Sequence, residues 1–270
     1  MQEVLDNSSK FDNNIKNVPS FDFNCDLAQS FGVYKNDKEF DLLDYVSSVN
    51  ISAGFHAGDP SAIKNALLKA KDKNVVIGVH IGFNDIQGFG SRMMNLSEEE
   101  VETLVIYQVG ALMSFAKAYG LEIEHVRPHG AMYRLASENF TFSCAIAKAI
   151  KKCSQWLVYV GASGDIISKV GEFVKLPTAQ EIKLNKTYNA DGTIDYDGDE
   201  INDVDLLIRR LQGLIKSSQI SNNANRFSVI KADTIHFSNR ENSLELIKKA
   251  NELIVPKPVS YSKAESSGWA

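Results

Sequence analysis

Hydrophobic and polar side chains alternate along the segment Phe21–Leu27, which reads Phe-Asp-Phe-Asn-Cys-Asp-Leu. A period of two is typical of a β-strand with one polar face. The polar face would carry Asn24 and Asp26, and the opposite face would bury Cys25 as a packed thiol. The pattern therefore predicts a strand that delivers polar groups to one side of a sheet.

Short apolar runs alternate with amphipathic stretches along the rest of the chain. The runs predict strands over residues 45–53, 75–80, 123–127, 156–161, 178–184 and 227–232. Apolar residues at helical spacing and end signals predict helices over 39–45, 61–73, 97–119, 136–151, 203–216 and 242–253. Strands and helices that alternate without a linker indicate one parallel α/β domain. We expect a seven-stranded β/α barrel over residues 21–255, with a mobile N-terminal extension (1–20) and an irregular C-terminal tail (256–270).

Composition narrows the class of partner. The chain has 270 residues, 44% of them hydrophobic, and a formal net charge of -5 with acids and bases interspersed. It offers no basic stripe for nucleic acid and no apolar run of the roughly 18 residues that suggest a membrane span. Its three cysteines lack the spacing of a zinc site or a disulfide framework. We expect a cytoplasmic protein that binds a small molecule, with no nucleic acid or membrane partner.

Polar residues stand at or just beyond the ends of five predicted strands. They are Asn24 and Asp26, His56 and Asp59, His80 and Asp85, Arg127 and His129, and Asp233. Closing a parallel barrel brings these ends onto one rim, so residues far apart in sequence meet there. Each alone is more often structural, as a helix cap for Asp59 or a core imidazole for His80. Their joint placement favours a shared site.

Two chemistries fit this set. Asp26 with two or three of His56, His80 and His129 could hold a divalent metal, because carboxylate and imidazole donors with an open position make a hydrolytic metal site. Alternatively, a carboxylate orients an imidazole that moves protons, while Arg127 binds an anionic substrate bidentately. The chain has no HExxH, Walker or GxGxxG motif to choose between them.

Four segments, Asn24–Gly32, Asn50–Pro60, Gln87–Gly90 and Pro128–Tyr133, together resemble the LamB/YcsF family. The resemblance covers about residues 21–253 and implies a seven-stranded β/α barrel related to the polysaccharide-deacetylase-like fold. It also implies a part in the ATP-dependent opening of 5-oxoproline, a cyclic amide, to glutamate, with Mg accompanying the ATP. Two further subunits, B and C, are the implied partners.

The resemblance also implies roles for single residues. Asp26 with His56 or His129 would activate water or handle phosphoryl chemistry on the lactam oxygen, and Arg127 and Arg92 would bind a carboxylate or phosphate. The remaining family site positions are preserved as candidate substrate-binding residues, at Asn24, Asp59, His80, Asp85 and Asp233. The irregular segment 187–200 is interpreted as a lid over the site.

The chain departs from the family pattern at several of its site positions. Arg127 replaces a usual lysine, Gln29 a glutamate, Ala53 a cysteine, Asn185-Lys186 an Asp-Arg pair, and His236-Phe-Ser-Asn-Arg240 the stretch Cys-Val-His-Gly-Asp. The last change, which includes Ser238 and Asn239, removes a histidine and a carboxylate from a rim loop. These departures leave two alternatives beside the 5-oxoprolinase hypothesis: a metal-dependent deacetylase or amidase of the same fold, and a non-catalytic scaffold or binding subunit with a degenerate site.

Overall fold

The computed structural model describes residues 20–36, 38–224 and 226–259. The predicted N-terminal extension therefore lies almost wholly outside the described residues, as does most of the predicted tail.

Seven parallel strands form a closed barrel, as the sequence predicted. In order around the barrel they are β1 (Asp22–Leu27), β2 (Ser48–Ser52), β3 (Val76–Ile81), β4 (His125–Pro128), β5 (Val158–Ala162), β6 (Thr178–Ile182) and β9 (Thr234–His236). The last strand pairs with both β6 and β1 and so closes the ring. All seven carboxyl ends consequently meet at one rim.

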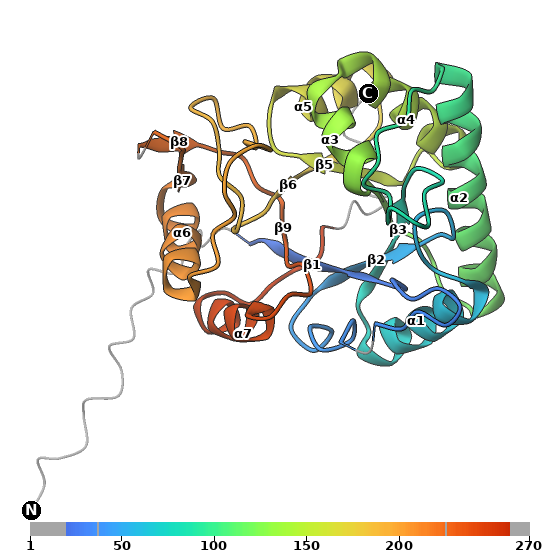
Figure 1. Ribbon diagram of the computed structural model, residues 1–270, viewed down its shortest axis with the longest axis horizontal. Coiled ribbons are helices and arrows are strands. Elements are labelled where there is room, and N and C mark those ends of the chain that lie inside the picture. Colours follow the sequence, from blue (N-terminus) through green and yellow to red (C-terminus); the bar gives the residue numbers. More distant parts are fainter. Residues whose placement is uncertain (1–19, 37, 225, 260–270) are drawn as a thin grey trace, which may run out of the picture.

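Helices surround the barrel, with α2 and α6 on opposite sides (Figure 1). They are α1 (Pro60–Lys73), α2 (Glu98–Ala118), α3 (Gly130–Glu138), α4 (Phe140–Cys153), α5 (Asp165–Val174), α6 (Val204–Ser217) and α7 (Ser243–Leu253). Their starts follow local sequence signals. Ser97 and Glu100 form a capping box at the start of α2, and the Asp203 side chain caps α6. No helix among the described residues is both long and apolar enough to cross a membrane.

The barrel interior is polar on most of its strands. In β1 and β2 the inward positions are Asp22, Asn24 and Asp26, then Ser48 and Asn50, and hydrogen bonds join them across the two strands. Cys25 is buried in the apolar core, as the alternation predicted. Gly78 on β3 makes room for an imidazole, because a Cβ there would lie only 2.1 Å from Nε2 of His125.

The amino-terminal end of the barrel is closed by a structural network. The buried carboxylate of Asp22 accepts hydrogen bonds from Ser47 (2.6 Å), Ser48 (2.8 Å) and Thr234. Val259, beyond the last helix, packs against apolar side chains of β5 and β6. The polar residues at the opposite, carboxyl rim of the barrel are thereby separated from this closed end.

The prediction that residues 227–232 form the seventh barrel strand is wrong. Phe227–Val229 (β8) pairs antiparallel with Gln219–Ser221 (β7) in a separate hairpin, and the barrel strand is the three-residue β9. The hairpin forms because Asn222 closes a tight turn, its side-chain oxygen accepting from the backbone N–H groups of Ala224 and Arg226. Asp233 therefore precedes the barrel strand instead of following it.

Three helix predictions also need correction. Residues 38–45 form successive turns with hydrogen bonds between residues three apart, and Glu39 turns inward to accept from the Gln29 backbone N–H at 2.7 Å. The helix predicted over 136–151 is two helices, since Asn139 ends α3 and its side chain caps α4. The helix α5 was not predicted at all.

Candidate active site at the carboxyl rim of the barrel

Asp26, at the end of β1, has charged or imidazole neighbours on both carboxylate oxygens. Its Oδ1 accepts from Asn50 Nδ2 at 2.9 Å and from Arg127 Nη1 at 3.4 Å, and lies 3.6 Å from His80 Nδ1. Its Oδ2 lies 3.5 Å from His236 Nε2. Burial raises the pKa of Asp26, but His236, Arg127 and His129 outweigh that effect and bring the pKa below its usual value. Asp26 is therefore a carboxylate at neutral pH.

Arg127 is buried and its guanidinium is fully engaged within the protein. Nε and Nη2 donate to the two carboxylate oxygens of Glu181 at 2.6 and 2.8 Å, and Nη1 donates to His80 Nε2 at 2.8 Å. Burial lowers the pKa of Arg127, yet Glu181 and Asp26 more than offset this and raise it. The bidentate edge that was predicted to bind a substrate anion is thus occupied by Glu181.

The bond from Arg127 also fixes the tautomer of His80. Because a guanidinium has no acceptor, Nε2 of His80 must accept, and in the neutral imidazole the proton is on Nδ1. Burial lowers the pKa of His80 well below its usual value, with His129 and Arg127 adding to the effect. His80 is accordingly a neutral ring whose N–H faces Asp26.

His129 is the imidazole best placed to accept a proton. Its Nε2 lies 2.8 Å from the carbonyl oxygen of Phe89 and must donate to it, which leaves the Nδ1 lone pair free. Burial lowers the pKa of His129 to about 4, against the opposing effect of Asp26. At neutral pH this half-buried imidazole is therefore an unprotonated base near a carboxylate.

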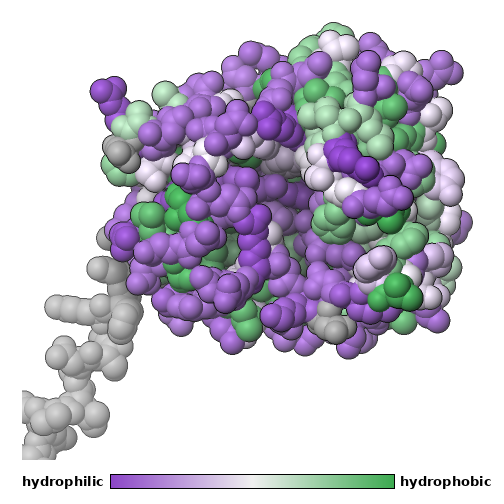
Figure 2. Space-filling view, viewed as in Figure 1, coloured by the Kyte–Doolittle hydropathy of each residue, from purple (hydrophilic) through white to green (hydrophobic). Residues whose placement is uncertain are grey.

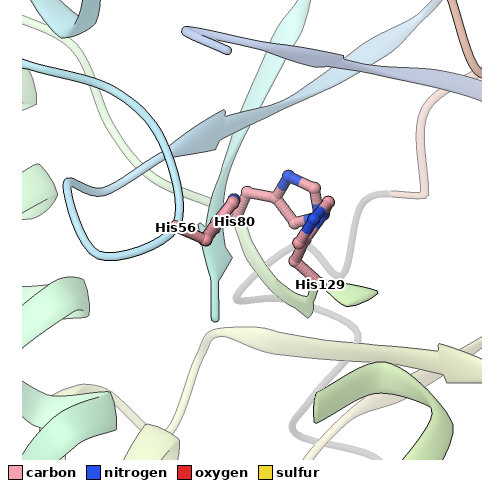
Figure 3. A group of neighbouring side chains, drawn as sticks. All are labelled: His56, His80 and His129. Carbon is pink, nitrogen blue, oxygen red and sulfur yellow. The ribbon is translucent and has the colours of Figure 1, made fainter. Parts of the chain in front are cut away.

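His56 lies against His129 and Gly82. The His56 and His129 rings are stacked with centroids 4.2 Å apart, and His56 Nε2 is 3.1 Å from Ser52 Oγ. A Cβ at Gly82 would lie 2.4 Å from His56 Nδ1, so only glycine fits there. Figure 3 shows the three imidazoles of His56, His80 and His129 gathered in one place although they come from separate segments.

The three imidazoles bring together the donors of a metal site but not its geometry. One nitrogen of each ring lies within 4.8 Å of the others, and Nδ1 of His56 and of His80 has no hydrogen-bond partner. A metal lies in the plane of each imidazole at about 2.0–2.1 Å from the nitrogen. The planes of His56 and His129 are within 7° of parallel, so they do not meet at one ion, and His80 Nδ1 carries a proton. The three imidazoles could therefore hold a metal ion only if one ring turned from this orientation.

His236, on β9, joins the site from the strand that was misplaced in the sequence-based prediction. Its Nδ1 donates to Asn24 Oδ1 at 2.8 Å, which directs Nε2 toward Asp26. Outward from His236 lies a pocket of about 290 Å³ whose wall includes Asn185 and Arg240. One face of the molecule is hollowed near its middle, with mostly hydrophilic surface in the hollow (Figure 2).

The remaining candidate residues lie outside this cluster or maintain its loops. Asp59 caps α1, with its two carboxylate oxygens accepting from Ala62 N and Gly32 N, both at 2.8 Å. Asp85 pairs with Arg92, whose Nε donates at 2.7 Å, and holds the loop that carries Phe89. Asp233 lies at the opposite end of the barrel, where it accepts from the Gln180 N–H at 2.7 Å.

Three residues of the rim, Glu181, Lys183 and His236, were not among the predicted site residues. Glu181 was visible as the only acid in the predicted strand 178–184, and an acid is rarely buried without a partner. Lys183 follows two residues later, on the same side of the chain as Glu181. His236 was noted only as a departure from the family pattern.

The sequence matches a known family over most of its length. The LamB/YcsF family matches residues 21–267. A 5-oxoprolinase A subunit from Bacillus subtilis is 40% identical over 217 residues, covering 79% of this chain and 84% of the relative. A 5-oxoprolinase A subunit from Campylobacter jejuni is 35% identical over 250 residues, or 91% and 98% of the two chains.

Solved structures agree with this assignment. The lactam utilization protein from Thermus thermophilus superimposes with a TM-score of 0.83 at 31% identity, covering 88% of this chain and 99% of that one. A putative cellobiose-phosphate cleavage protein from Enterococcus faecalis shares the fold alone, with a TM-score of 0.53 at 14% identity over 90% of this chain and 98% of that one. The chain therefore belongs to the LamB/YcsF family.

Proposed function

We propose that this chain is the A-type component of an ATP-dependent 5-oxoprolinase, which opens the cyclic amide of 5-oxoproline or a related lactam to give glutamate or its analogue. The observation that carries the proposal is the match over most of the chain to relatives named as the A subunits of 5-oxoprolinases. The rim supplies chemistry suited to an amide: a carboxylate, Asp26, beside a neutral base, His129.

The residues at the rim have separate roles in hydrolysis of the amide. Nδ1 of His129 takes a proton from water as the oxygen bonds to the lactam carbonyl carbon. When the C–N bond breaks, the imidazolium returns that proton to the leaving nitrogen. Asp26 stabilises the imidazolium, because it is negatively charged and close to His129. Arg127 and Glu181 position His80 and Asp26.

In this proposal ATP binds to a companion subunit and not to this chain. The sequence has no Walker phosphate loop, and we assign nucleotide binding, with its Mg²⁺, to the companion subunits B and C. Phosphoryl transfer from ATP to the lactam oxygen would release ADP and make the carbonyl carbon more electrophilic before water attacks it. Breaking the C–N bond would then give an acyl phosphate, which a second water hydrolyses to the carboxylate and inorganic phosphate. The metal-dependent deacetylase alternative loses support because the His56 and His129 rings are parallel.

The test is reconstitution of the three subunits. We expect ATP-dependent formation of glutamate from 5-oxoproline by the complete complex, and loss of it when this chain is omitted. The matched variants are His129→Gln, which removes the base, and the exposed Asp44→Asn, which leaves the site intact. If the complex turns over ATP but forms no glutamate, the scaffold alternative replaces this proposal.

A further inference from the structure

Lys183 is a cation at the rim that neither the family motifs nor the proposed mechanism uses. It directly follows β6 and lies two residues beyond Glu181, so the two side chains point to the same side of the strand. Glu181 reaches Arg127 inside the barrel. Lys183 therefore occupies the next layer outward, at the mouth of the barrel.

Four cations that lie at or near this mouth each have a carboxylate partner. Arg127 pairs with Glu181, Arg92 pairs with Asp85, and Lys186 and Arg240 both pair with Glu200. Within residues 20–36, 38–224 and 226–259, no carboxylate oxygen lies within 4.0 Å of Lys183 Nζ, and no hydrogen-bond acceptor is found for it. Among the described residues, the positive charge of Lys183 is thus left without a direct partner.

The surroundings of Lys183 favour an incoming anion. Its Nζ lies 4.5 Å from the centre of the Tyr133 ring, which offers only a weak attraction to the ammonium. Burial lowers the pKa of Lys183 to about 8, with Arg127 adding to the effect and Glu181 and Asp26 opposing it. A carboxylate in contact with Nζ would replace the water that this ammonium has lost.

We propose that Lys183 forms the subsite for the carboxylate of the substrate, so that this chain selects lactams that carry a negative charge. The inference rests on the proposed function and names the group that recognises the substrate. A carboxylate held there leaves the ring amide on the side of Asp26 and His129. Arg127 and Arg92, the anion-binding candidates from the sequence, are already paired and do not supply this contact.

The test compares two lactams that differ by one charge. Binding of 5-oxoproline and of 2-pyrrolidinone, which lacks the carboxylate, is measured by titration calorimetry on the full chain as wild type, Lys183→Met and Lys186→Met. The wild type should bind 5-oxoproline roughly tenfold to a hundredfold more tightly than 2-pyrrolidinone. Lys183→Met should bind the two equally, and Lys186→Met, whose lysine already pairs with Glu200, should keep the wild-type preference.

Two results would overturn the inference. One is a wild type without preference for 5-oxoproline, including one that binds neither lactam. The other is a preference retained by Lys183→Met, as expected if Lys183 only balances the charges of Asp26 and Glu181. The proposed function fails separately: the chain would still select the charged lactam, while the reconstituted complex would form no glutamate from it.

Discussion

Replacing Glu181 by glutamine should destabilise the fold strongly, because it leaves the Arg127 guanidinium buried without its main counter-charge. The pair is joined by hydrogen bonds of 2.6 and 2.8 Å, and the side chains are 0% and 2% exposed. Breaking one partner of such a pair costs about 3–5 kcal/mol. Asp26, 3.4 Å from Arg127, is the nearest remaining carboxylate and already accepts from Asn50.

Urea denaturation followed by circular dichroism measures the loss. With a slope of about 1–3 kcal/mol per molar urea, the midpoint of Glu181→Gln should fall by more than about 1 M. The double variant Glu181→Met/Arg127→Met should recover part of the stability, because the guanidinium that had lost Glu181 is gone, although Asp26 loses its contact with Arg127. Asp44→Asn removes an exposed ion pair with Lys73 and should cost less than about 1 kcal/mol. A loss below about 1 kcal/mol for Glu181→Gln, or no recovery in the double variant, would refute the reasoning.

Three further outcomes are expected. His129→Gln should lower kcat of the reconstituted enzyme by about 10²–10⁴, the usual contribution of a general base; an unchanged kcat would move this role to another residue. Since the pKa of Lys183 is lowered to about 8, the affinity for 5-oxoproline should be full below pH 8 and should fall as the pH rises above it. An affinity that stays constant up to pH 10 would contradict a role for the positive charge of Lys183. The same lowered pKa means that the charged form of Lys183 destabilises the fold below pH 8. In urea titrations at pH 7, Lys183→Met should therefore be more stable than the wild type by up to about 3 kcal/mol. A less stable variant would indicate that Lys183 has a structural role.

The sequence determined the local elements and the identity of much of the rim. Alternation along Phe21–Leu27 correctly directed Asn24 and Asp26 to the polar interior and Cys25 to the core. Repetition of strands and helices indicated the single parallel barrel. These features follow from periodicity, which depends on neighbours a few residues apart and is therefore visible in the chain itself.

Tertiary structure decided which strand closed the barrel and which charges were left for a substrate. The three residues of β9 carry little periodic signal, and pairing with β1 and β6 alone makes them a strand, while the more strand-like Phe227–Val229 turned into a local hairpin. That choice brought His236 to Asp26 and took Asp233 to the opposite end. Arg127 pairs with the buried carboxylate of Glu181, whereas Lys183 stays unpaired. This difference depends on contacts between distant strands. No pattern along the chain records those contacts, because they form only when the barrel closes.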